Sequence, residues 1–107
     1  GPEEMADQMW DRYQAFESYL SRFGLSVGEV DVSPVHSWKL VLKNGQSLIL
    51  GRNTDRFEDR LNRFSAVYRR VRNRAQAAYF DLRYDTGVAI GWKDDEPEEK
   101  SNGKGRD

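Results

Sequence analysis

An alternating stretch near the end of the chain decides the fold: residues 79–92 read YFDLRYDTGVAIGW. Its first half alternates apolar with charged residues, which is the period of a half-buried β-strand. The segment Asp85–Gly87 then predicts a type I turn with a glycine bulge, because Asp bonds its own backbone and Gly accepts a positive φ. The stretch is therefore predicted to form a β-hairpin in which Tyr84 pairs with Val88.

The two strands of this predicted hairpin have unlike faces. One face is expected to carry the bulky side chains, which are Phe80, Leu82, Tyr84, Val88, Ile90 and Trp92. The opposite face of the second strand carries only Ala89 and Gly91, which leaves room for a close neighbour. In the predicted register the N–H groups of Ala89, Gly91 and Lys93 point away from the first strand, because successive residues alternate. The last strand is thus expected to be an open edge.

The start of the chain predicts a helix and a short strand. Apolar residues at helical spacing predict an amphipathic helix that packs on the core, and they are Met5, Met9, Tyr13, Phe16, Leu20 and Phe23. Gly24 is expected to end this helix in the left-handed conformation. A strand is predicted at residues 28–33, where valines recur before Pro34.

A first hairpin is predicted in the middle of the chain. Residues 38–42 and 46–50 flank Asn44-Gly45, and this dipeptide favours a tight turn with a positive φ at both positions. One face of the hairpin is expected to be apolar, through Trp38, Leu40, Leu42, Leu48 and Leu50. The order of elements then predicts an α+β fold, with two helices on a largely antiparallel sheet that ends in a hairpin.

A second helix, rich in arginine, is predicted between the two hairpins. Asn53 or Thr54 is expected to cap it. Its buried stripe is predicted to be Phe57, Leu61, Phe64, Tyr68 and Val71. Eight arginines lie in or beside it and are expected on a solvated outer face: Arg52, Arg56, Arg60, Arg63, Arg69, Arg70, Arg72 and Arg74. A phosphate backbone could follow such a face, so nucleic-acid binding is the alternative function.

Composition narrows the function classes. The 107 residues fit one domain, and a net charge of -1 gives no whole-chain field for nucleic acid or membrane. Cysteine is absent and His36 is the single histidine, so no metal site, cofactor or catalytic group is predicted. A non-enzymatic protein is expected. Residues 1–2, Gly-Pro, are typical of a protease-cleavage scar, and the acidic, apolar-free residues 94–107 predict a disordered tail.

Several motifs together resemble the FtsQ family of bacterial cell-division proteins. They stand in the family's order and with similar spacing, over residues 3–93: Trp38–Leu42, Asn44-Gly45, Leu48–Arg52, Arg60–Tyr68, Asp81–Gly87 and Ile90–Trp92. The resemblance implies the C-terminal part of a periplasmic β-domain. It also implies a longer protein with a cytoplasmic tail, one membrane helix and a POTRA domain, held on the periplasmic side of the inner membrane.

The resemblance also implies partners and a binding site. Members of the family bind the division proteins FtsB and FtsL, and FtsB adds a strand to the last strand of the sheet. The implied contact positions in this chain are Arg52, Arg83, Tyr84, Asp85, Thr86, Gly87, Val88, Ala89, Gly91 and Trp92. Thr86 stands where the family often has serine, which keeps the hydroxyl. Arg83 is expected on the polar face of the hairpin, facing an acidic helix of the partner.

Overall fold

The computed structural model describes the backbone of residues 2–93 and the side chains of residues 7–93. Gly1 of the predicted cleavage scar, the predicted tail 94–107 and the side chain of Met5 lie outside this description. The long elements are α1 (Pro2–Ser21), β1 (Val27–Val32), β2 (Trp38–Leu42), β3 (Ser47–Gly51), α2 (Phe57–Arg70), β4 (Ala77–Asp81) and β5 (Ala89–Trp92). Short 3-10 turns, η1 (Thr54–Arg56) and η2 (Arg74–Gln76), lie at either end of α2.

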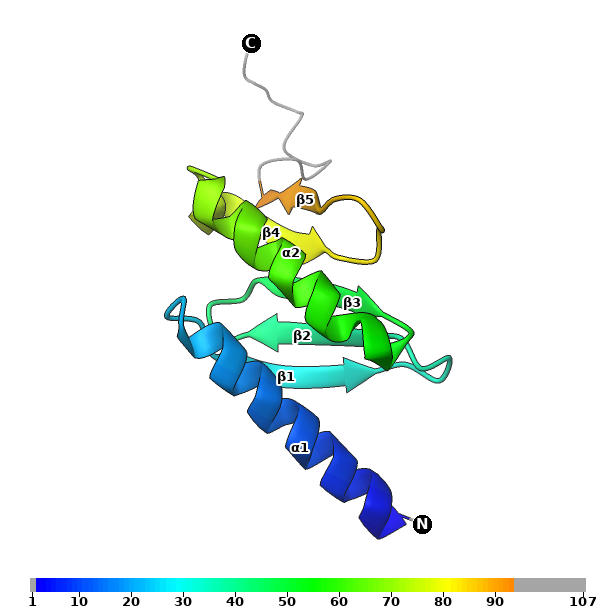
Figure 1. Cartoon of the computed structure of the whole chain (residues 1–107). Helices are drawn as coiled ribbons and strands as arrows, with labels where there is room; N and C mark the ends of the chain where they lie inside the picture. The colour runs from blue at the N-terminus through cyan, green and yellow to red at the C-terminus, as the bar shows by residue number, and fades with distance from the viewer. Residues whose placement is uncertain (1, 94–107) are drawn as a thin grey trace, which may run out of the picture.

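The five strands form one open sheet in the order β1-β2-β3-β4-β5. Neighbouring strands are antiparallel except β3 and β4, which are parallel because α2 carries the chain back across the sheet between them. Both helices lie on the same face of the sheet, α1 over β1 and β2 and α2 over β3 and β4 (Figure 1). The predicted α+β fold with a largely antiparallel sheet is confirmed.

The hydrophobic core lies between this sheet face and the two helices. Its fully buried members include Leu20, Leu40, Leu48, Leu50, Phe64, Phe80 and Leu82. Phe64 is central, because its ring meets Phe80 at 5.1 Å and Tyr68 at 5.2 Å, both in tilted or edge-to-face geometry. The predicted inward faces of the first hairpin and of α2 are therefore confirmed.

The first helix follows its predicted stripe. Phe16 and Leu20 are buried, and Tyr13 and Phe23 pack partly buried against the core. Glu17 joins the helix to β1, because its carboxylate accepts hydrogen bonds from the Val27 N–H and the Ser26 hydroxyl, both at 2.8 Å. These bonds hold the pKa of Glu17 below its ordinary value. Gly24 has a φ of 73°, as predicted for the helix end.

The turn between β2 and β3 differs from the prediction. Gly45 has a φ of 93°, but Asn44 does not adopt a positive φ. The Gly45 N–H donates to the Leu42 carbonyl at 2.9 Å, and the Asn44 side chain accepts from the Gln46 N–H at 2.9 Å. The turn is therefore closed with a positive φ at Gly45 alone. The side chain of Asn44 stabilises it by accepting the Gln46 N–H.

The start of α2 also differs from the prediction. Neither Asn53 nor Thr54 makes a side-chain capping bond. Asn53 instead has a left-handed φ of 55°, and its carbonyl accepts from the Arg56 N–H at 2.9 Å to form the η1 turn. The chain must turn sharply from the end of β3 onto the helix, and this turn takes the place of a cap. Val71 has an extended backbone just beyond the helix and is half-buried.

Candidate partner-binding edge

β5 ends the sheet, and its pairing with β4 is shifted from the predicted register. Asp81 pairs with Ala89, so residues 82–88 form a loop. The predicted pair of Tyr84 with Val88 is therefore wrong.

The loop is longer than predicted because Leu82 belongs with β3. Its N–H donates to the Ile49 carbonyl at 2.9 Å, and its side chain is fully buried. The chain therefore leaves β4 after Asp81, three residues before the predicted end of this strand at Tyr84. Gly87 does not adopt a positive φ, so the predicted glycine bulge is also wrong.

This register reverses the predicted direction of the β5 amides. Since Leu82 directs its N–H toward β3, the alternating residues Tyr79 and Asp81 direct theirs toward β5. Their partners are Gly91 and Ala89, whose N–H groups must point back toward β4. Ile90 lies between them and directs its N–H to the open side. The N–H that points away from the sheet at this edge is therefore that of Ile90. The predicted outward direction of the Ala89 and Gly91 N–H groups is wrong.

The predicted bare face of β5 is covered by the chain itself. The ring of Tyr79 lies so close to Gly91 that any added Cβ would collide with it. The other face follows the prediction, because Val88, Ile90 and Trp92 pack partly buried against the core. Only glycine fits at position 91, because the ring of Tyr79 on β4 occupies the space of a side chain.

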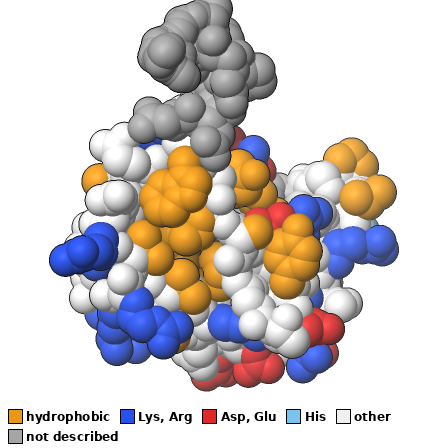
Figure 2. Space-filling model, turned by 90° about the horizontal axis from the view of Figure 1, so that it is seen from above, with side chains coloured by type: hydrophobic (Ala, Val, Ile, Leu, Met, Phe, Trp, Pro, Cys, Tyr) orange, Lys and Arg blue, Asp and Glu red, His pale blue; other side chains and the backbone are white. Residues whose placement is uncertain are grey.

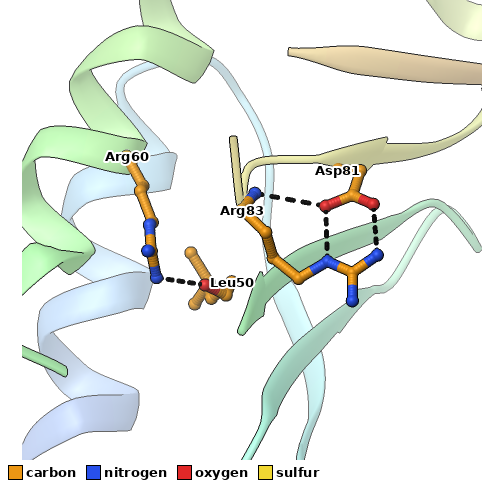
Figure 3. A network of polar contacts seen from close by, with 4 residues as sticks. All are labelled: Leu50, Arg60, Asp81 and Arg83. Carbon is orange, nitrogen blue, oxygen red and sulfur yellow. Dashed lines mark hydrogen bonds and ion pairs between the residues drawn. The ribbon is translucent and has the colours of Figure 1, made fainter. Parts of the chain in front are cut away.

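Arg83 is tied to Asp81 at the base of the loop (Figure 3). Its guanidinium donates to both carboxylate oxygens, at 2.9 and 2.7 Å, and its N–H donates to Asp81 Oδ1 at 3.1 Å. The stem of Arg83 crosses Gly51, where an added Cβ would lie 2.7 Å from its Cγ and where φ is +80°. Asp81 is buried, and Arg83 is about half exposed. Arg83 is therefore held by an internal partner, Asp81, which the alternation of residues 80–84 did not predict.

The ion pair gives a testable pH dependence. The pKa of Asp81 lies below its ordinary value, mainly because Arg83 hydrogen-bonds its carboxylate, although burial opposes this. A lowered folded-state pKa contributes stability that is present above the unfolded pKa of about 3.9 and is lost as the pH falls. We expect Asp81→Asn to lower the free energy of unfolding at neutral pH and to flatten its decline in acid. Glu17 should keep part of that decline.

Urea unfolding between about pH 3 and pH 7 measures both effects. Equal losses of stability in the parent and in Asp81→Asn over this range would show that the carboxylate contributes nothing through its ionisation.

Arg60 holds the end of β3 from α2. It is 8% exposed, and its Nη1 donates to the carbonyls of Leu50 at 2.8 Å and Arg52 at 2.9 Å. The predicted place of Arg60 on the solvated outer face is therefore wrong. The sequence spacing indicates this burial. Arg60 follows Phe57 by three residues and precedes Phe64 by four, which places it on the same, buried side of the helix.

The predicted contact residues gather at the β5 end of the molecule. Arg52, Arg83, Tyr84, Asp85, Thr86 and Ala89 are exposed, whereas Gly87, Val88, Gly91 and Trp92 are half-buried. Figure 2 looks down on this end and shows hydrophobic side chains in one group, with Lys and Arg side chains and several Asp and Glu side chains around it. Tyr84 is 52% exposed, so its predicted place on the core-facing side is wrong. A hydrophobic centre with a charged rim is a surface suited to a protein partner.

Among the described side chains, residues 7–93, no three His, Cys, Asp or Glu groups lie where they could share a metal ion. Over the described backbone, residues 2–93, neither helix has the length and apolar character needed to cross a bilayer.

The model of the cell-division family FtsQ/DivIB, C-terminal, matches residues 1–83. The chain belongs to the FtsQ/DivIB family. Relatives named cell division protein FtsQ include that of Aliivibrio fischeri, 38% identical over 101 residues, and that of Escherichia coli, 34% identical over 106 residues. The FtsQ of Vibrio cholerae is 34% identical over 93 residues.

These matches cover most of this FtsQ-family chain and a smaller share of the relatives. They take in 94% of the chain for the Aliivibrio and Escherichia proteins and 86% for the Vibrio protein. The matched shares of the relatives are 39%, 38% and 35% in the same order. The described fold is thus that of a division-protein domain, and it spans less than two-fifths of the curated relatives.

Proposed function

We propose that this domain is a non-enzymatic binding module of the divisome that takes up a strand of FtsB, in complex with FtsL, along β5. The observation that carries the proposal is the open edge at β5. There the Ile90 N–H faces away from the sheet, beside a hydrophobic surface with a charged rim (Figure 2). An added strand would bond this backbone and bury side chains against that surface. In the longer protein the domain would stand on the periplasmic side of the inner membrane.

The opposite edge of the sheet is less suited to strand addition. The pairing of β1 with β2 is interrupted by a register shift between Val27 and Glu29, and such a bulge disturbs the regular spacing of edge groups. Glu29 and Asp31 lie side by side on this strand, and their shared hydrogen bond raises the pKa of Glu29. Charged side chains on an edge strand disfavour its pairing with another strand.

The chemistry at β5 matches a partner with acidic and aromatic groups. Arg52 can offer a forked donor to a carboxylate, whereas the fork of Arg83 is already bound to Asp81. Tyr84 and Trp92 offer amphipathic ring surface. Asp85 and Thr86 are exposed in the loop before β5, and Gly87 beside them is half-buried. The domain would therefore recognise its partner by backbone pairing along β5 and by charge at the loop.

A titration of the labelled domain with the periplasmic segment of FtsB, alone and with FtsL, tests the proposal. We expect one-to-one binding with NMR shift changes concentrated in residues 83–92 and at Arg52. Shift changes concentrated in β1, or no binding by either preparation, would contradict it.

Reversal of one exposed charge separates electrostatic recognition from folding. Arg52→Glu should weaken binding by about 1 kcal/mol or more, because an attracting charge becomes a repelling one. Its unfolding midpoint should hardly change, because Arg52 is exposed and only its backbone carbonyl is bound by Arg60. Arg72→Glu is the matched control, since Arg72 is exposed beyond the far end of α2. Equal losses for Arg52→Glu and Arg72→Glu would mean that net charge, and no local contact, drives binding.

Arg83→Glu is a poorer test of charge recognition than Arg52→Glu, because Arg83 is bound to Asp81. The substitution would place a second carboxylate beside buried Asp81, so a loss of binding would include the effect of a disturbed loop.

Nucleic-acid binding is the less favoured alternative, because several of the arginines bind groups of this chain. Arg60 and Arg63 donate to backbone carbonyls of this chain. Arg69 and Arg74 lie over the rings of Phe23 and Tyr68. A groove that follows phosphates needs these guanidinium groups turned outward.

A further inference from the structure

Helix α2 reaches the loop 82–88 through one side chain. Arg63 Nη2 donates to the Tyr84 carbonyl at 2.6 Å, across 21 residues of sequence. Arg63 is half-buried, and its Nε is enclosed without a hydrogen-bond partner. Enclosing part of a guanidinium is unfavourable unless its bonds compensate. The position of Arg63 is therefore defined by its contact with the loop.

We propose that Arg63 is a positioning residue that holds the loop 82–88 in the shape that the FtsB strand meets. The inference rests on the proposed function. Arg63 makes no contact with the partner and acts through the Tyr84 peptide. Its role is distinct from that of Arg52, whose exposed charge faces the partner.

Three anchors together fix this end of the domain. Arg60 fixes the end of β3, the fork from Arg83 to Asp81 fixes the first residues of the loop, and Arg63 fixes the loop at Tyr84. Beyond Tyr84 the exposed residues 85–86 lead to β5. Without Arg63 the loop would be held at its base alone. The segment before β5 would then have to be ordered when the partner binds, and that ordering lowers affinity.

Neutral and charged replacements distinguish positioning from charge. Arg63→Gln removes the guanidinium and its charge, whereas Arg63→Lys keeps the charge and an N–H donor. Arg70→Gln is the matched control, because it removes the same charge from the exposed last residue of α2. Backbone order parameters from ¹⁵N relaxation report loop motion in the free domain, and calorimetry reports affinity for the FtsB segment.

Arg63→Gln should lower the order parameters of residues 84–87 and weaken binding about tenfold. Arg63→Lys should recover a large part of both, and Arg70→Gln should change neither. Unchanged order parameters in Arg63→Gln would overturn the proposal, and so would a mobile loop with unchanged affinity. Equal affinity losses in Arg63→Gln and Arg70→Gln would assign the effect to charge and overturn it too. If the parent fails to bind FtsB, the proposed function fails, while the order parameters still decide whether Arg63 holds the loop.

Discussion

Ile90→Pro is expected to abolish binding of the FtsB segment while the domain stays folded. Proline has no N–H, and the Ile90 N–H is the group that β5 directs to its open side. The pairing of β4 with β5 uses the neighbouring residues Ala89 and Gly91, so it should survive. We expect the affinity to fall by two orders of magnitude or more, because the incoming strand loses a central backbone bond and its register.

Two controls separate the backbone effect from other losses. Ala89→Pro removes an N–H that points toward β4, so it should destabilise the β4–β5 pair in the free domain. Ile90→Ala keeps the backbone and removes the side chain that packs partly on the core, so its loss of binding should be much smaller. Circular dichroism and calorimetry on all three variants decide the matter. A folded, tightly binding Ile90→Pro protein would mean that FtsB does not pair with β5 at this residue.

Phe64→Ala is expected to have the largest effect on stability. The ring is fully buried, and it touches Phe23, Tyr68 and Phe80. Truncating such a phenylalanine costs about 3–5 kcal/mol, which approaches the whole stability of many small domains. The variant should be largely unfolded or highly sensitive to urea. Partner binding should fall with it, because α2 would no longer hold Arg60 and Arg63 in place.

Trp10→Ala is the matched control for an aromatic residue outside the core. Trp10 is 58% exposed and stacks on Tyr13. Its loss should change the free energy of unfolding by no more than about 0.5 kcal/mol. Urea unfolding of both variants gives the comparison. A loss of less than about 1 kcal/mol for Phe64→Ala would contradict the central place of this ring.

The sequence predicted which residues face the core better than it predicted how strands pair. Leu40, Leu42, Leu48 and Leu50 alternate, and the structure buries all four. A period of two fixes the faces of a strand, but it carries no information about which neighbour each N–H will meet. Leu82 kept its predicted face and bonded β3, which moved the start of β5 and reversed the direction of its edge groups.

The resemblance predicted the residues of the candidate site, but it did not predict the residues that hold the site in place. The exposed positions at Arg52, Tyr84 and Thr86 could be named before the fold was known. Arg60 and Arg63 could not be separated from their exposed neighbours by residue type, because a guanidinium on a helix normally faces water. Their roles depend on carbonyl groups that other segments bring within reach, and only tertiary structure reveals those.

Amide hydrogen exchange at Ile90, with and without the FtsB segment, tests the central claim most directly. In the free domain Ala89 and Gly91 should exchange slowly and Ile90 quickly, because only the first two N–H groups face β4. Binding should slow exchange at Ile90 by about a hundredfold or more, as its N–H enters the new strand pair. Fast exchange at Ile90 in the saturated complex, or protection that appears at β1 instead, would contradict strand addition at β5.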